Sequence, residues 1–262
     1  MDRYCLFGYP VEHSKSPEIH QEFARQTGEE LVYEKIEVEK HFETAAMSFF
    51  AAGGCGANVT LPHKQAALEY ADMLTGRAKR AGAVNTLMAD ADGIFGDNTD
   101  GVGLLRDLTV NNGVAIRDSR VLVLGASGAA RGILGPLLAE KPAEIVIANR
   151  TPERAERLAE EFGAQGRALD AAGKGYDLVI NATSASLQHE LPLDDENVIR
   201  EGGTACDLVY LDEPTLFLRW AQAAGAGQCI DGWGMLVEQA AESFALWRGI
   251  RPETAGLLRR NG

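Results

Sequence analysis

The stretch VLVLGASGAARGILGPLLAE, residues 121–140, decides the fold. It begins with an apolar run, passes through a glycine-containing turn and ends in an apolar helical pattern. A strand followed by a glycine turn and a helix is typical of the start of a dinucleotide-binding unit. We expect Gly125 to make the tight turn and Ala130 to let the helix pack closely on the strand. Ser127 replaces the usual second glycine, so it should crowd a bound pyrophosphate unless its hydroxyl donates to it, while Gly128 supplies room.

The next strand, EIVIANR at 144–150, indicates which dinucleotide the unit binds. It ends in Asn149 and Arg150, and Thr151 follows. Sites for NAD usually carry an acidic residue here, which binds the ribose 2′-hydroxyl, whereas an arginine suits a 2′-phosphate. We therefore expect NADP in preference to NAD. Phosphate-loop NTPases and short-chain dehydrogenases are excluded, because the chain has neither GxxxxGK[ST] nor a tyrosine followed four residues later by lysine.

Strand and helix patterns alternate along the chain, which predicts an α/β fold with mostly parallel strands covered on both faces. The expected strands are 4–9, 31–38, 56–61, 121–124, 144–150, 176–183, 203–210 and 225–232, with a hairpin over 83–98 that turns at 91–93. The expected helices are 16–27, 41–54, 62–74, the second part of 121–140, one after Pro152, 234–249 and 252–260. Ser16 is expected to cap the first helix. The loop at 100–103 is the expected boundary between two domains.

Composition and charge exclude several classes of partner. The formal net charge of the 262 residues is -13, which disfavours nucleic acid and anionic membrane surfaces as partners. No apolar run approaches the roughly 20 residues of a membrane helix. Four cysteines without a CxxC pair indicate reduced thiols and a cytoplasmic protein. Five histidines without metal-ligand spacing predict that there is no metal site.

Four polar clusters lie outside the nucleotide-binding stretch. They are residues 13–17, 58–64, 97–101 together with Asn85, and 232–240. In the second cluster Lys64 falls in the first turn of a predicted helix, where the helix dipole opposes a positive charge. Each cluster taken alone has an ordinary explanation as a turn, a helix cap or an exposed face. Their joint occurrence beside a nucleotide-binding unit indicates an enzyme site.

The clusters and the glycine turn together resemble the shikimate dehydrogenase family. The shared motifs are S-x-S-P, NVTxPxK, N-T after A-V, N-x-D-G, the glycine turn, NRT, NATS and GxxMLxxQ, and they occur in the family's order over essentially the whole chain. The resemblance implies a substrate-binding and catalytic α/β domain at 1–101, completed by C-terminal helices at 236–262. It implies an NADP-binding Rossmann domain at 102–235, with the active site in the cleft between the domains.

The resemblance also implies an activity. Members of the family interconvert 3-dehydroshikimate and shikimate with NADP(H), a step in the biosynthesis of aromatic amino acids through chorismate. A small-molecule substrate, a cytoplasmic location and a monomer or homodimer are expected accordingly. Two residues, Lys64 and Asp100, are implied as the catalytic acid-base pair, with the lysine exchanging a proton with the substrate oxygen and the carboxylate orienting it.

The binding residues are implied by the same resemblance. Ser14 and Ser16 should hold the ring carboxylate, with Thr60 nearby. The ring hydroxyls should contact Asn58, Asn85, Asp100 and Gln239. The implied cofactor-binding residues are Gly125, Ala126, Ser127, Gly128, Ala129, Asn149, Arg150, Thr151, Thr183, Tyr210, Gly232 and Met235. The chain departs from the family pattern at Ser127, at His63, which stands in place of an aromatic residue beside Lys64, and at Ser186, where glycine is commoner.

Three alternatives remain open. One is a quinate/shikimate dehydrogenase that prefers NAD, against which Arg150 argues. A more distant one is a Rossmann enzyme of the methylene-tetrahydrofolate dehydrogenase type, against which Ser14, Ser16 and the Lys64–Asp100 pair argue. The third is a non-catalytic regulator that binds NADPH or shikimate, which would have no need of that pair.

Overall fold

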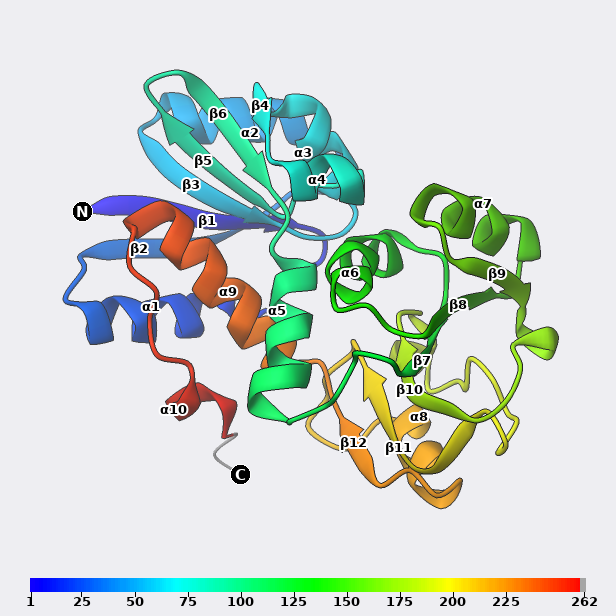
Figure 1. Ribbon diagram of the computed structural model, residues 1–262. Helices are drawn as coiled ribbons and strands as arrows, with labels where there is room; N and C mark the ends of the chain where they lie inside the picture. The colour runs from blue at the N-terminus through cyan, green and yellow to red at the C-terminus, as the bar shows by residue number, and fades with distance from the viewer. Residues whose placement is uncertain (260–262) are drawn as a thin grey trace. The chain divides into compact units, whose positions relative to one another are not determined.

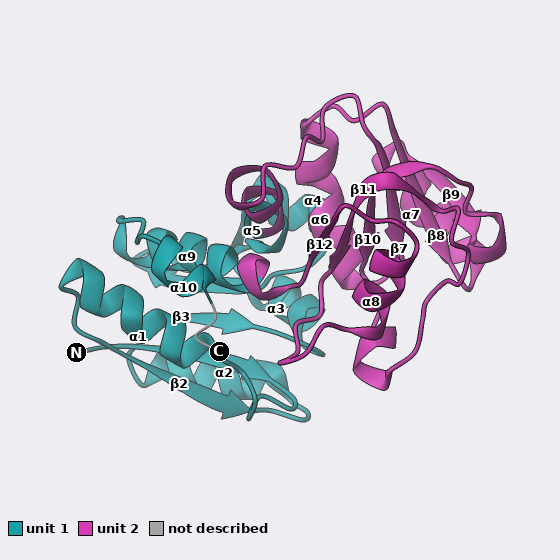
Figure 2. Cartoon of the chain, turned by 90° about the horizontal axis from the view of Figure 1, so that it is seen from below, with its two compact units in different colours: residues 1–103, 236–262 teal, residues 104–235 magenta. Residues whose placement is uncertain are grey.

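The computed structural model describes residues 1–259, and the chain folds as two compact units (Figure 2). Unit 1 comprises Met1–Gly103 and Leu236–Gly262, and unit 2 comprises Leu104–Met235. Each unit is built on its own six-stranded sheet with helices around it (Figure 1). The predicted two-domain α/β fold is therefore confirmed.

The sheet of unit 1 has the strand order β2-β1-β3-β5-β6-β4. Its strands are β1 (Asp2–Gly8), β2 (Leu31–Glu37), β3 (Gly54–Val59), β4 (Met73–Leu74), β5 (Thr86–Asp90) and β6 (Gly93–Asp97). Strands β2, β1 and β3 are parallel, while β5 is antiparallel to both of its neighbours. The predicted hairpin is the β5–β6 pair. Its register sets Asn58 opposite Thr86 and Thr86 opposite Asp97, so three polar residues lie across three neighbouring strands.

Alternating side chains of β1 divide the core of unit 1 into two layers. The helices are α1 (Ser16–Thr27), α2 (Phe42–Ala51), α3 (Lys64–Tyr70), α4 (Gly76–Ala81), α5 (Asp100–Arg106), α9 (Trp233–Arg248) and α10 (Ala255–Leu258), with α5 and α9 each continuing across a unit boundary. On one face Tyr4 stacks on Trp247 of α9, with ring centroids 4.6 Å apart. On the other face Phe7 meets Phe42 and Phe49 of α2 edge-on. Tyr4 and Phe7 are three positions apart in β1, so their side chains point to opposite faces of the sheet and contact different helices.

Two expected local structures differ in unit 1. The helix expected over 62–74 ends at Tyr70, because Met73–Leu74 pairs with β6 as a short strand instead. Ser16 does not cap the first helix but is its first residue, and Lys15 occupies the cap position without a side-chain hydrogen bond. The hydroxyl of Ser14 accepts from the Ser16 N–H in place of a cap.

Unit 2 is an all-parallel sheet with the order β12-β11-β10-β7-β8-β9. Its strands are β7 (Arg120–Leu124), β8 (Glu144–Asn149), β9 (Gln165–Ala168), β10 (Tyr176–Asn181), β11 (Ile199–Asp207) and β12 (Gln228–Ile230). The helices are α6 (Gly128–Ala139), α7 (Pro152–Phe162) and α8 (Leu216–Ala223), with a π-helical turn at Asp107–Asn111 and 3₁₀ turns at Leu169–Ala171 and Ala185–Gln188. Helices α6 and α7 pack on one face, and α8 packs on the other.

The chain order reverses between β7 and β10. From β7 the chain moves through β8 to the edge strand β9, and it then returns to β10 on the other side of β7. In open α/β sheets ligands bind at the carboxyl ends of the strands beside such a reversal. The loops after β7 and β10 are therefore the part of unit 2 where a dinucleotide is expected. Within residues 1–259 no helix combines the length and apolar character needed to cross a membrane.

Candidate active site

Lys64 and Asp100 lie against each other in unit 1. Lys64 is the first residue of α3, and its Nζ donates to Asp100 Oδ2 at 2.5 Å. The carboxylate side chain is 9% exposed and the lysine side chain 22%. A cation at a helix N-terminus is opposed by the helix dipole, and a carboxylate in direct contact offsets that cost. Asp100 is therefore the negatively charged partner that stabilises Lys64 at the start of α3.

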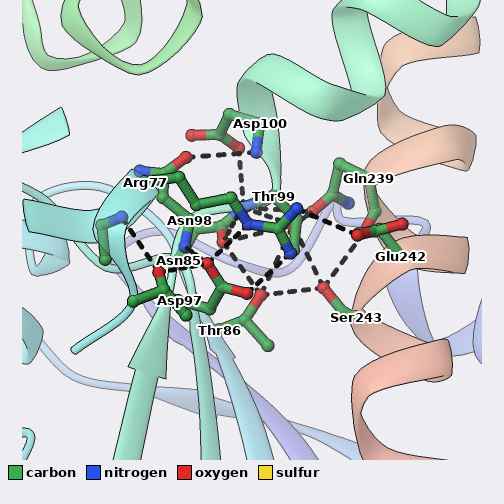
Figure 3. A network of polar contacts seen from close by, with 12 residues as sticks. Arg77, Asn85, Thr86, Asp97, Asn98, Thr99, Asp100, Gln239, Glu242 and Ser243 are labelled. Atoms are coloured by element: carbon green, nitrogen blue, oxygen red, sulfur yellow. Dashed lines mark hydrogen bonds and ion pairs between the residues drawn. The ribbon is translucent and has the colours of Figure 1, made fainter. Parts of the chain in front are cut away.

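Asn85 holds the second oxygen of the same carboxylate. Its Nδ2 donates to Asp100 Oδ1 at 2.8 Å and to Thr99 Oγ1 at 2.9 Å, while its Oδ1 accepts from the Thr99 N–H at 2.8 Å (Figure 3). Gln239 Oε1 lies 3.3 Å from the same Nδ2. With one oxygen on Lys64 and the other on Asn85, the plane of the Asp100 carboxylate is fixed. The structure thus brings together four predicted residues from four segments of the chain.

A close approach between α5 and α9 makes the contact of Gln239 possible. A Cβ atom added at Gly103 would lie 2.7 Å from the Gln239 backbone nitrogen, so only glycine fits there. This explains the second glycine of the stretch DGVG in physical terms. The amide of Gln239 also donates from Nε2 to the Leu236 carbonyl at 2.9 Å.

Asn58 is buried and joins the same network through its neighbours. Its Nδ2 donates to Thr86 Oγ1 at 3.2 Å and to Ser243 Oγ at 3.0 Å, and the Thr86 hydroxyl in turn donates to Asn85 Oδ1. Its Oδ1 accepts from the Tyr33 hydroxyl at 2.8 Å. Both ends of the amide are therefore bonded within unit 1. A contact between Asn58 and a substrate requires the exchange of one of these bonds.

His20 supports Asn58 from the other side. Its Nε2 lies 3.2 Å from Asn58 Oδ1, and its ring stacks on Tyr33 with centroids 4.4 Å apart. Burial lowers the pKa of His20 to about 3, so the ring is neutral. Because Asn58 Oδ1 can only accept, the ring proton belongs on Nε2.

Ser14 and Ser16 lie together at the start of α1, with their hydroxyl oxygens 3.1 Å apart. Burial raises the pKa of the Tyr33 phenol well above its ordinary value, an effect that the Ser16 side chain partly offsets. Thr60 follows β3, donates its N–H to the Phe7 carbonyl at 2.8 Å and is half-buried.

Tyr33, Thr86, Thr99 and Ser243 belong to the network but were not predicted. Each makes hydrogen bonds with one or more of the predicted amides. Thr86 and Thr99 stand within quoted patterns, N-T after A-V and residues 97–101, but neither was assigned a contact, and Tyr33 and Ser243 carry no distinctive spacing. The signal that could have found Thr86 is strand register, because it sits directly opposite Asn58.

His63 has a packing role. It is buried, its ring stacks on Phe42 with centroids 5.4 Å apart, and its Nε2 lies 2.5 Å from the Val38 carbonyl oxygen. The histidine thus occupies the position of an aromatic residue as a ring packed in the core. The hydrogen bond of His63 Nε2 is made to the backbone carbonyl of Val38 and not to Lys64.

In unit 2 the predicted cofactor residues gather at one edge of the sheet. Gly125 follows β7, Asn149 ends β8, Thr183 follows β10, Tyr210 follows β11 and Gly232 follows β12. The carboxyl ends of parallel strands meet at one edge, so these residues share it. Ala126 lies in the turn before α6, Gly128 and Ala129 are the first two residues of that helix, and Met235 packs against the core cluster to which α6 contributes.

Gly125 has a backbone that only glycine adopts readily. Its φ is +101°, and an added Cβ would lie 2.9 Å from Thr183 Cγ2. Ser127 is the N-cap of α6, with its hydroxyl accepting from the Ala130 N–H at 3.4 Å and donating to the Ala182 carbonyl at 3.0 Å. The hydroxyl is thus engaged within the protein. The crowding of a bound pyrophosphate by Ser127 stays a prediction.

The end of β8 presents cationic side chains. Asn149 Nδ2 donates to the Thr151 carbonyl at 2.9 Å, which shapes the turn into α7, and Arg150 and Thr151 are exposed. Arg154, which was not predicted, lies exposed in the first turn of α7. In the part of the chain that the structure describes, neither arginine forms an ion pair. Both guanidinium groups are available to an anion.

Ser186 belongs to a buried cluster that joins β10 to β11. Its hydroxyl donates to Asp207 Oδ2 at 2.6 Å, and Asn181 Nδ2 donates to Asp207 Oδ1 at 3.2 Å. Burial raises the pKa of Asp207, although these bonds act in the opposite direction. Asn181 Oδ1 accepts from the Thr183 hydroxyl at 2.7 Å. The serine therefore stabilises the loop that carries Thr183. No group of three or more metal-ligating side chains occurs within residues 1–259.

Comparison with known proteins covers both units. Three family models match: the shikimate dehydrogenase substrate binding domain over residues 6–87, shikimate / quinate 5-dehydrogenase over 108–198, and the shikimate 5'-dehydrogenase C-terminal domain over 232–259. The chain is 56% identical to a shikimate dehydrogenase (NADP(+)) from Alkalilimnicola ehrlichii, covering 98% of this chain and 97% of that protein. A Pseudomonas putida Ael1 enzyme superposes with a TM-score of 0.93 at 43% identity, covering 98% and 97% of the two chains. Shikimate 5-dehydrogenase from Thermus thermophilus in complex with NADP(H) and shikimate superposes with a TM-score of 0.90 at 36% identity and the same coverage.

Proposed function

Since this chain belongs to the shikimate dehydrogenase family, we propose that it catalyses the reversible NADPH-dependent reduction of 3-dehydroshikimate to shikimate with Lys64 and Asp100 as its acid-base pair. The observation that carries the assignment of the pair is the 2.5 Å contact between Lys64 Nζ and Asp100 Oδ2, held on its far side by Asn85. The step belongs to the biosynthesis of aromatic amino acids.

Lys64 moves the proton of the reaction. In the reducing direction the Lys64 ammonium donates a proton to the keto oxygen as it becomes a hydroxyl, and in the oxidising direction the amine takes that proton back. The side chain is 22% exposed, so water can restore its proton after each turnover. Asp100 orients the amine and accepts from a neighbouring ring hydroxyl. The bound NADPH supplies the hydride.

The remaining polar residues of unit 1 recognise the substrate. The hydroxyls of Ser14, Ser16 and Thr60 are donors for the ring carboxylate, and the amides of Asn85 and Gln239 offer a donor and an acceptor to the ring hydroxyls. Asn58 contacts the substrate by exchanging one of its hydrogen bonds within unit 1 for a bond to a ring hydroxyl. A carboxylated polyol needs hydrogen-bond donors around its carboxylate and both donors and acceptors around its hydroxyls, and these serine, threonine and amide side chains supply both.

The loops at the carboxyl edge of unit 2 fit NADP. Gly125 lets the backbone approach a pyrophosphate, and the turn at 126–129 opens α6, whose N-terminus favours an anion. The exposed guanidinium groups of Arg150 and Arg154 support binding of a 2′-phosphate by these residues, which favours NADP over NAD. Thr183, Tyr210, Gly232 and Met235 are proposed to line the nicotinamide end.

Two further expectations remain predictions. A cytoplasmic location is supported by the four cysteines, all of which are free thiols. A monomer or homodimer is expected from the family resemblance alone.

The proposed reaction is tested by mixing the purified protein with shikimate and NADP⁺ and following absorbance at the NADPH band. We expect a steady rise with shikimate and NADP⁺, and slower rates when NAD⁺ or quinate is substituted. Faster turnover of quinate with NAD⁺ would make the chain a quinate/shikimate dehydrogenase instead. Binding of shikimate and NADPH without any turnover would identify a regulator.

A further inference from the structure

Arg77 bonds two acidic residues at once. Its Nε and Nη2 donate to the two oxygens of Asp97 at 2.7 and 2.6 Å, and its Nη1 donates to Glu242 Oε1 at 3.0 Å (Figure 3). The two hydrogen bonds to Asp97 fix the plane of the guanidinium. The direction in which Nη1 donates to Glu242 is thereby fixed as well. The distance between the two carboxylates is therefore set by one rigid group.

The two acidic residues belong to the two segments that carry the site. Asp97 ends β6 and directly precedes the turn that delivers Asp100, and its Oδ1 also accepts from the Asn98 N–H at 2.7 Å. Glu242 lies on α9 three residues after Gln239, hence on the same face of that helix. The hydrogen bonds of the Arg77 guanidinium go to Asp97 and Glu242 and not to Lys64 or Asp100. Arg77 ties the turn that carries Asp100 to the helix that carries Gln239.

The ion-pair chain continues beyond Glu242. Arg251 donates to Glu242 Oε2 at 2.8 Å and to Glu238 Oε2 at 2.6 Å, and Thr254 donates to Glu238 Oε1 at 2.8 Å. Glu238 is buried and adjoins Gln239 in the chain. These bonds attach the segment after α9 to the helix. The orientation of α9 is thus held from two sides.

A buried ion pair of this kind fixes the positions of its partners more than it raises the free energy of unfolding. Asp97 is 2% exposed, and burial would raise its pKa, but the bonds from Arg77 and Thr75 outweigh burial and hold the pKa below its ordinary value. The carboxylate therefore stays ionised and bound to Arg77. A buried ion pair recovers little more than the cost of removing both charges from water, whereas its bidentate geometry specifies where its partners sit.

We propose that Arg77 is a positioning residue for substrate binding: by joining Asp97 to Glu242 it sets the spacing between the Asp100 turn and Gln239. The inference rests on the proposed function, since it assumes that these two residues contact shikimate. It assigns a role in the reaction to a side chain that no sequence motif singled out.

The test is the double variant Arg77→Gln/Asp97→Asn. The glutamine amide stands where Nε of the arginine stood, so it reaches residue 97 but cannot extend to Glu242. The asparagine keeps the oxygen that accepts from Thr75 and Asn98, and no unpaired charge is left buried. We expect the KM for shikimate to rise at least about 10-fold, because small displacements of a positioning group are costly. The KM for NADP⁺ should stay within about 2-fold, because the proposed cofactor residues lie in unit 2.

A matched control is Arg3→Gln/Glu34→Gln, which removes an ion pair of similar length between β1 and β2 in the same unit. It should leave both KM values unchanged. The single variant Arg77→Lys, which can reach only one acidic partner at a time, should fall between the parent and the double variant. A folded double variant with the parent's KM for shikimate, or one whose KM rises equally for both substrates, overturns the proposal. Failure of the parent protein to oxidise shikimate overturns the proposed function instead, so the two outcomes are distinguishable.

Discussion

At the scale of single residues, Lys64 is the charge whose placement is hardest to account for by folding alone. It begins α3, where the helix dipole opposes a cation, and it is held there by Asp100. A side chain kept in an electrostatically opposed position is a frequent mark of a functional group. The contact with a buried carboxylate is consistent with proton transfer.

Replacing Lys64 by Ala should lower kcat by at least about 10²-fold, because the proton donor is lost. Steady-state rates with shikimate and NADP⁺ measure this. Lys79→Ala, at an exposed position on α4, is the control and should keep the parent rate. A folded Lys64→Ala protein with near-normal kcat would contradict the acid-base assignment.

His63→Phe should leave kcat within about 2-fold of the parent, since the replacement keeps a planar ring in the core and His63 is packed away from the reacting groups. The phenylalanine ring keeps the stacking on Phe42 and loses only the bond to the Val38 carbonyl. The measurement is a pH–rate profile of parent and variant. A profile that moves along the pH axis in the variant would show that His63 affects the proton of Lys64 after all.

At the scale of secondary-structure elements, the long patterned segments could be predicted and the short ones could not. The strand, glycine turn and helix at 121–140 appear as β7 and α6, because strong periodicity and a glycine turn act together. β9, with the sequence QGRA, has no apolar pattern and is a strand only because it pairs with β8. Helix α8 was missed even though Thr215 caps it by accepting from the Leu218 N–H.

Two glycines of the same turn provide a matched pair for stability. Gly125→Ala should lower the free energy of unfolding of unit 2 by about 1–2 kcal/mol, because φ is +101° and the new methyl meets Thr183. Gly128→Ala should be neutral or stabilising by up to about 1 kcal/mol, because nothing lies within 4 Å and the residue starts α6. Denaturant unfolding measures both. Equal effects at the two positions would show that the turn adjusts freely.

At the scale of the whole molecule, most of the candidate site could be identified from sequence because its motifs are ordered along the chain. Lys64, Asn85, Asp100 and Gln239 do meet in one hydrogen-bonded network. The supporting hydroxyls were missed because they depend on strand register and on α9 packing across the sheet. These relations join residues up to 185 positions apart and leave no local signal.

The stability of unit 1 should fall in acid because of His20. The folded state keeps the ring neutral with a pKa of about 3, whereas the unfolded chain binds a proton near the ordinary value of 6.5. Protons therefore favour unfolding, and stability is lost as the pH falls from about 6.5 towards 3. At pH 5 the loss from this residue is about 2 kcal/mol relative to neutral pH.

The contribution of His20 to the pH dependence of stability is measured by comparing the free energies of unfolding of the parent and His20→Gln from pH 7.5 to pH 5. The variant should be the less stable protein at pH 7.5, and the difference should shrink by about 2 kcal/mol at pH 5 because glutamine does not titrate. His13→Gln, at an exposed site, should follow the parent at every pH. A constant difference between parent and His20→Gln across this range would mean that the ring takes up its proton as readily in the folded state as in the unfolded chain.

The division of unit 1 into two stretches of chain has a consequence for its synthesis on the ribosome. Everything in unit 2 is contiguous and can form as soon as residue 235 has emerged. By then Tyr4 still lacks Trp247, and Phe23 still lacks Phe244, so the aromatic contacts of α9 with β1 and α1 are missing. The nascent protein thus completes unit 2 before unit 1, and α9, most of which is translated after unit 2, closes the core of unit 1 and brings Gln239 to Asn85.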